Sequence, residues 1–143
     1  MGVNTNLFSQ LVPQPAAPSI RFGDCIFSAP ELVTSNTLIG IGGLESPGLY
    51  VVMAYDPWWT PLPYRPLYFG ESDKIWSRAT PSHENYESWK RQAATATLYR
   101  AFHHMTGSTR GQRQARESAL IAHYNTPCNQ RLSFDLGLGF FGR

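Results

Sequence analysis

Two short segments, each with a tyrosine close to a glycine, constrain the fold of this chain most strongly. A Gly-Leu-Tyr triplet at 48–50 lies near the start of a run, residues 47–55, that is rich in β-branched and aromatic residues and opens after a turn signal. A Tyr-Phe-Gly triplet at 68–70 closes a second apolar run. Both runs predict β-strands, and the rest of the chain must pack around them.

The connection between these two strands is rich in proline. Residues 56–66 contain four prolines among eleven residues, which argues against a helix or an internal strand. We therefore predict a long hairpin loop. Its aromatic residues Trp58, Trp59 and Tyr64 either stack on unpaired bases or fold back and plug the hairpin, and the sequence leaves both readings open.

The segments that follow predict a mixed succession of helices and strands. Residues 72–79 indicate a short helix with Ser72 as its N-cap, and residues 84–92 indicate a second helical piece. Residues 96–105 form a third predicted strand, and residues 110–124 a final helix. The order predicts a small α/β sandwich, with a central three-stranded mixed sheet flanked by helices.

The two ends of the chain lie outside this core. Residues 1–46 form an N-terminal extension with an extended lead, a strand over 19–27 that is broken at a Gly-Asp pair, a helical turn over 29–33 and a glycine-rich loop over 39–43. Residues 130–143 form a tail whose apolar residues alternate with glycines, which suits an edge strand or a docking arm. The central module is 47–129.

Composition limits the classes of function. Hydrophobic residues make up 42% of the 143 residues, which fits one globular domain. The net charge of +2 is low for a protein that only coats nucleic acid. Neither a signal peptide nor an apolar stretch long enough to cross a membrane is visible, so we expect a cytoplasmic protein without a membrane partner.

One carboxylate of the final helix is in an unusual position. At 100° per residue, Glu117 falls on the same side as the apolar residues Leu120, Ile121 and Tyr124. A glutamate on a buried face needs a partner charge or a metal ion. Glu117 is therefore the first candidate for a functional residue.

Taken together, these features resemble the GIY-YIG nuclease family over about residues 47–129. Each triplet supplies a tyrosine, an arginine and a histidine follow the second triplet, a glutamate precedes a Leu-Ile pair in the last helix, and an asparagine closes the motif after a proline. The matching residues here are Tyr50, Tyr68, Arg78, His83, Glu117 and Asn129.

The resemblance implies a metal-dependent endonuclease that hydrolyses DNA phosphodiester bonds. Glu117 would hold one Mg²⁺ or Mn²⁺, because a lone carboxylate with several waters suits a hard, reluctantly dehydrated cation. Tyr50 would accept the proton of the attacking water, and His83 could take that proton in turn because its pKa lies near neutrality. Tyr68 and Asn129 would orient the phosphate or support the base.

Basic residues would complete such a site. Arg78 would grip the scissile phosphate, for which a planar and permanently charged guanidinium is well suited, and Lys74 would assist it. Arg110, Arg113 and Arg116 would follow the phosphate backbone beside the site, although a solvated helix surface explains these three almost equally well.

Two readings from other classes remain. The chain could be a non-catalytic nucleic-acid-binding module on the same scaffold, although its modest charge does not favour binding without turnover. It could also be a structural or assembly protein, with a homodimer formed through the C-terminal tail or the N-terminal extension.

Overall fold

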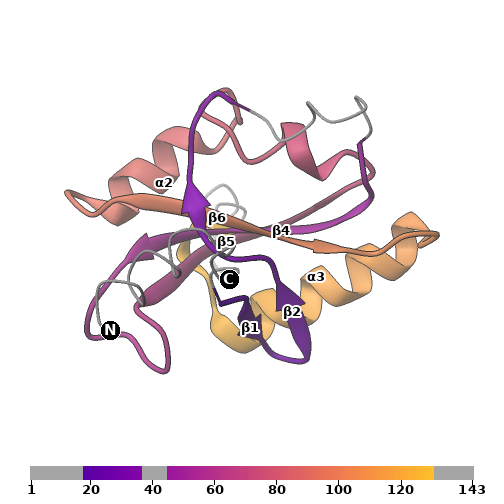
Figure 1. Ribbon diagram of the computed structural model, residues 1–143, viewed down its shortest axis with the longest axis horizontal. Helices are drawn as coiled ribbons and strands as arrows, with labels where there is room; N and C mark the ends of the chain where they lie inside the picture. The colour runs from indigo at the N-terminus through magenta and orange to yellow at the C-terminus, as the bar shows by residue number, and fades with distance from the viewer. Residues whose placement is uncertain (1–17, 37–44, 131–143) are drawn as a thin grey trace, which may run out of the picture.

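The computed structural model describes residues 18–36 and 45–130 (Figure 1). These residues form a mixed α/β fold with two β-sheets and two α-helices. The strands are β1 (Ile20–Phe22), β2 (Cys25–Phe27), β3 (Glu31–Leu32), β4 (Gly48–Tyr55), β5 (Tyr64–Ser72) and β6 (Leu98–His104). The helices are α2 (Tyr86–Ala93) and α3 (Arg110–Tyr124), with short 3₁₀ turns η2 (Ile75–Ser77) and η3 (Pro127–Asn129).

The main sheet differs from the predicted one. Its four strands follow the order β3-β6-β4-β5, and every pair of neighbours is antiparallel. The prediction of a three-stranded mixed sheet is therefore wrong for the described residues. The chain returns through α2 so that β6 runs antiparallel to β4, and β3, from the N-terminal extension, adds the fourth strand.

The central strand β4 explains why its sequence is almost continuously apolar. Leu49, Val51 and Met53 face α3, whereas Tyr50 and Val52 face α2 on the other side of the sheet. Figure 1 shows the two helices on opposite faces. Because both faces are covered, neither set of alternating residues meets water, and β4 carries no polar stripe.

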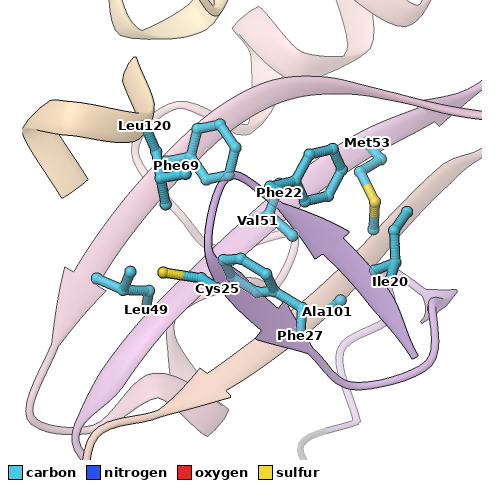
Figure 2. Packing of buried hydrophobic residues seen from close by; sticks show 10 residues of the cluster. All are labelled: Ile20, Phe22, Cys25, Phe27, Leu49, Val51, Met53, Phe69, Ala101 and Leu120. Atoms are coloured by element: carbon cyan, nitrogen blue, oxygen red, sulfur yellow. The ribbon is translucent and has the colours of Figure 1, made fainter. Parts of the chain in front are cut away.

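The N-terminal extension contributes directly to the core. Strands β1 and β2 form a hairpin whose Phe22 and Phe27 pack against Phe69 of β5, and Leu120 of α3 belongs to the same cluster (Figure 2). The predicted break in this strand is the hairpin turn, where Gly23 has a φ of +60° that suits glycine. Residues 20–27 are thus part of the folded unit.

Two predicted helical segments are wrong. Residues 29–33 contain strand β3 instead of a helical turn, because Glu31 pairs with Arg100 of β6 in both backbone register and side-chain charge. Residues 72–79 form only the short turn η2, since β5 continues to Ser72. The hydroxyl of Ser72 accepts a hydrogen bond from the Lys74 N–H at 2.9 Å, which stabilises a turn instead of capping a helix.

The proline-rich connection is shorter than predicted. Strand β5 begins at Tyr64 and includes Pro66, which is tolerated because β5 is an edge strand and its pairing with β4 shifts register between Val52 and Met53. In the loop before it, Trp59 lines a small recess beside β1, while Trp58 is 89% exposed. One tryptophan therefore folds back towards β1, and the other projects into solvent.

Helix α3 has the predicted bounds, and local capping explains why. The side chain of Thr109 accepts from the Gln112 N–H, and the Gln112 side chain accepts from the Thr109 N–H. Asn125 ends the helix in the left-handed conformation. Neither helix of the described part is long and apolar enough to cross a bilayer.

Several predicted features lie outside the described residues. They are the extended lead within 1–17, the glycine-rich loop at 39–43 and the apolar tail beyond residue 130. The homodimer through the tail stays a prediction for the same reason.

Candidate functional site

The two motif tyrosines lie side by side on the face of the sheet that α2 covers. In the β4–β5 ladder Tyr50 pairs with Gly70 and Val52 pairs with Tyr68, so the tyrosines are diagonal neighbours. Their ring centroids are 6.0 Å apart. Tyr50 is 1% exposed, whereas Tyr68 on the edge strand is only partly buried.

A loop between η2 and α2 brings a histidine and an arginine to this pair. His83 Nε2 lies 2.9 Å from the Tyr50 hydroxyl, and Arg78 Nη2 lies 3.3 Å from the same nitrogen. Arg78 also pairs with Glu84 at 2.9 Å. The four residues Tyr50, Tyr68, Arg78 and His83 therefore form one connected cluster.

Contacts with the sheet and with α2 hold this loop in place. Arg100 of β6, almost fully buried, donates a hydrogen bond to the Ala79 carbonyl at 2.9 Å and to the Thr34 and Asn36 carbonyls. His83 stacks on Trp89 of α2, with ring centroids 4.5 Å apart. These contacts fix the position of His83 beside Tyr50.

Burial shapes the proton affinities of the cluster. It lowers the pKa of His83 to about 4, so the imidazole is neutral near pH 7. It also raises the pKa of Tyr50 and of Tyr68 above the usual phenol value. The hydrogen bond from Arg78 lowers the pKa of Glu84 to about 2, so that carboxylate stays ionised.

Glu117 is half-buried on α3, the helix that covers the face of the sheet opposite to the tyrosines. Its negative charge contributes to the raised pKa of Tyr68. Its own pKa is raised to about 7, first by burial and then by the negative charge of Glu71. Glu71 is paired with Arg113 at 3.0 Å. Glu71 also pairs with Arg110 at 3.7 Å, so two arginines already offset the charge that acts on Glu117.

The donor set fits a weakly held hard cation. No group of three or more histidine, cysteine, aspartate or glutamate side chains gathers around one point within residues 18–36 and 45–130. A single carboxylate oxygen, with water completing the coordination, is a common arrangement for Mg²⁺ and also suits Mn²⁺. Glu117 has the chemistry for this role, and Glu71 is a second carboxylate whose charge acts on it.

The side chain of Asn129 binds the backbone of the edge strand. Its side-chain amide accepts from the Phe69 N–H at 2.9 Å and donates to the Phe69 carbonyl at 3.0 Å. The amide thereby pairs with the outer edge of β5 next to Tyr68, as a further strand would. Its placement gives Asn129 a structural function in holding the edge strand.

The basic residues expected to follow phosphates are largely engaged with carboxylates of this chain. Arg113 is buried on Glu71 and the Ser108 carbonyl, and Arg116 contacts Asp24 and the Cys25 sulfur. Arg110 is 77% exposed, and Lys74 is exposed at the start of η2. Arg110 and Arg113 therefore share Glu71 as a partner, at 3.7 and 3.0 Å, whereas Arg116 pairs with Asp24.

The sequence did not single out Glu71, Glu84 or Arg100. Glu71 directly follows the second triplet, and its alternation with Phe69 places it on the α3 side of β5. The two-residue period of a strand could therefore have predicted the side of β5 on which Glu71 lies. The partners of Glu84 and Arg100 depend on loops that no local pattern specifies.

No protein-family model, curated protein or solved structure matches this chain.

Proposed function

We propose that this chain is a metal-dependent endonuclease of GIY-YIG type that hydrolyses DNA phosphodiester bonds. The observation that supports the proposal is the connected cluster of Tyr50, Tyr68, Arg78 and His83, with Glu117 acting on it electrostatically. These side chains come from four segments far apart in the sequence. A purely structural role gives no reason for a guanidinium, an imidazole and two phenols to converge on one face of the sheet.

Each group suits one requirement of phosphodiester hydrolysis. The reaction needs a proton acceptor for the attacking water, positive charge at the phosphate and stabilisation of the leaving oxygen. The tyrosine pair is the proton acceptor. Arg78 supplies positive charge, and its partly exposed side chain can exchange Glu84 for a phosphate oxygen. A divalent ion, when bound, would offset the negative charge that develops on the phosphate.

Glu117 is the residue that would hold this ion. With a pKa of about 7, the Glu117 carboxylate is partly protonated near neutral pH, and a bound cation would displace that proton. The proposal includes DNA as the partner, the cytoplasm as the compartment, and Arg110 and Lys74 as the exposed cations that meet the phosphate backbone.

Cleavage of plasmid DNA tests the proposal. Purified protein is incubated with plasmid in Mg²⁺ or Mn²⁺, with and without chelator. We expect nicking that the chelator abolishes and that Glu117→Ala or Arg78→Ala lowers at least about 100-fold. The matched control is Glu87→Ala, an exposed glutamate of α2 that pairs with Lys90.

The outcomes separate the competing functions. Cleavage that persists in Glu117→Ala or Arg78→Ala would contradict this mechanism. Binding of DNA without cleavage across several divalent metals would instead support a non-catalytic nucleic-acid-binding module.

A further inference from the structure

Arg78 presents its guanidinium to Glu84 in the geometry that it would present to a phosphate. Nη1 of Arg78 lies 3.3 Å from Oε1 of Glu84, and Nη2 lies 2.9 Å from Oε2. The two carboxylate oxygens therefore accept from two different nitrogens of one guanidinium. Arginine forms this paired arrangement with carboxylates and with phosphates alike, so Glu84 takes the positions that two phosphate oxygens would take.

The pair lies at the border between the buried cluster and solvent. On the inner side, Nη2 of Arg78 lies 3.3 Å from Nε2 of His83, which in turn lies 2.9 Å from the Tyr50 hydroxyl. On the outer side, 36% of the Arg78 side chain and 58% of the Glu84 side chain are exposed. An anion that arrives from solvent thus meets the guanidinium at the face that Glu84 occupies.

The charge of Glu84 makes it a permanent competitor for Arg78. The hydrogen bonds from Arg78 lower the pKa of Glu84 to about 2, so the carboxylate is ionised near neutral pH. Burial lowers the pKa of His83 to about 4, below the near-neutral value expected from the sequence, so the imidazole adds no positive charge. Arg78 is therefore the cation of the cluster near pH 7, and Glu84 neutralises it.

The backbone beside Glu84 is held in place. The His83 N–H donates to the Thr80 carbonyl at 3.0 Å, and the Asn85 N–H donates to Nδ1 of His83 at 2.9 Å. Because these neighbours are fixed, Glu84 leaves Arg78 by rotation of its own side chain, and its charge then stays a short distance from the guanidinium. An anion that has replaced Glu84 is still repelled by it.

Building on the proposed nuclease function, we propose that Glu84 determines which phosphates Arg78 binds: it competes with a phosphodiester for the guanidinium, and it disfavours a phosphomonoester more strongly. A phosphodiester carries one negative charge, whereas a phosphomonoester carries close to two at neutral pH and above. Repulsion from Glu84 grows with the charge of the ligand. Since hydrolysis converts a diester into a monoester, Glu84 favours the exchange of product for substrate.

The variant Glu84→Gln isolates the charge of this carboxylate. Glutamine has nearly the same shape and keeps one oxygen that accepts from Arg78. An ion pair as exposed as this one contributes little to stability, so the variant should fold like the native chain. Glu87→Gln is the matched control, because Glu87 is also exposed and pairs with Lys90 at 3.3 Å.

The test is a titration of the full chain with methyl phosphate, a monoester, and with dimethyl phosphate, a diester, without metal or DNA. Binding is followed at pH 8 and constant ionic strength through the NMR signal of the Arg78 guanidinium carbon, assigned with Arg78→Lys. We expect Glu84→Gln to tighten binding of dimethyl phosphate about 3-fold and of methyl phosphate about 10-fold, because each unit of ligand charge contributes a similar factor. Glu87→Gln should change neither affinity.

Three results would overturn the proposal. The first is binding that is equal or weaker in Glu84→Gln, because Glu84 would then be a positioning partner of Arg78 and not its competitor. The second is the same gain for both esters, which would exclude selection by charge. The third is a guanidinium signal that responds to neither ester in Glu84→Gln.

These results do not depend on nuclease activity. Tighter binding in Glu84→Gln without cleavage of plasmid would support the phosphate site and contradict the nuclease function. In an active nuclease, Glu84→Gln should lower the KM for DNA about 3-fold, and inhibition by methyl phosphate should become about 10-fold stronger. Cleavage with an unchanged KM and unchanged inhibition would support the nuclease function and overturn the assignment of Glu84.

Discussion

Gly70 lies opposite Tyr50 in the β4–β5 ladder, and the phenol ring of Tyr50 occupies the space that a side chain at position 70 would fill. A β-carbon on residue 70 would overlap Cζ and the hydroxyl oxygen of Tyr50. Gly48 is constrained in the same way, because its β-carbon would overlap the His103 carbonyl oxygen of β6. The glycines of both triplets are therefore required by close packing around β4.

Gly70→Ala should destabilise the fold and displace Tyr50. The added methyl group meets a ring that is buried on all sides, and overpacking of this kind costs about 1–3 kcal/mol. Urea unfolding measures the loss, and cleavage should fall because the hydrogen bond between Tyr50 and His83 is disturbed. The control is Gly111→Ala in α3, where the nearest atom to a new β-carbon is 3.9 Å away. That variant should be neutral or slightly stabilising.

Glu117→Gln should stabilise the protein at high pH in the absence of metal. The folded state raises the Glu117 pKa from 4.5 to about 7, so it holds the proton more tightly than the unfolded chain. Native stability therefore falls as the pH rises from about 4.5 to about 7, and the variant avoids this loss. After a discount for solvent screening at a half-buried site, we expect a gain of roughly 1 kcal/mol at pH 8.

The comparison at low pH is the control for this prediction. Below pH 4.5 both states carry a protonated Glu117, so the native chain and Glu117→Gln should unfold at similar temperatures. Thermal unfolding at pH 4 and pH 8 in chelator measures both effects. A gain that is the same at the two pH values would mean that ionisation of Glu117 is not its cause.

Asn129→Ala should loosen the outer edge of β5. The variant removes both hydrogen bonds to the Phe69 backbone and leaves that N–H and carbonyl with water alone, at a cost of about 1–2 kcal/mol. Hydrogen exchange at the Phe69 amide should become faster. Gln130→Ala is the control, because Gln130 donates only to the Thr126 carbonyl. Unchanged exchange at Phe69 would contradict the structural function of Asn129.

Arg100→Met should release both β3 and the loop that carries Arg78. The buried guanidinium pairs with Glu31 and donates to three backbone carbonyls, all of which lose their partner. Loss of such a buried pair costs about 3–5 kcal/mol. Urea unfolding measures it against Arg91→Met, an exposed position of α2 that should change stability by less than about 0.5 kcal/mol. Equal stability of the two variants would contradict this function of Arg100.

Some elements were predictable because the interactions that form them lie close together in the sequence. Residues 110–124 are a helix with a capping box at one end and Asn125 at the other. The apolar run 47–55 is strand β4, and the Gly23-Asp24 break is a hairpin turn. Helix period, strand period and turn chemistry act over a few residues, so one sequence suffices to recognise them.

The wrong predictions involve competition between local and distant partners. Ser72 looked like an N-cap, but strand pairing with Gly48 extends β5 through it. Glu31 was predicted to lie in a helical turn, but its ion pair with Arg100, which is distant in sequence, stabilises it in the sheet. Local propensities are worth a few tenths of a kcal/mol, and a buried ion pair or a strand ladder outweighs them.

The sequence by itself determined the central strands, the last helix and the residue types that a phosphate-cleaving site needs. Only the tertiary structure decided which of them meet: Tyr50 with His83, His83 with Arg78, and Asn129 with a backbone edge. The physical reason is the distance along the sequence over which each kind of interaction acts. Side-chain periodicity is set by bonds along the chain, whereas contacts between distant side chains depend on strand register and on a loop anchored by a buried arginine.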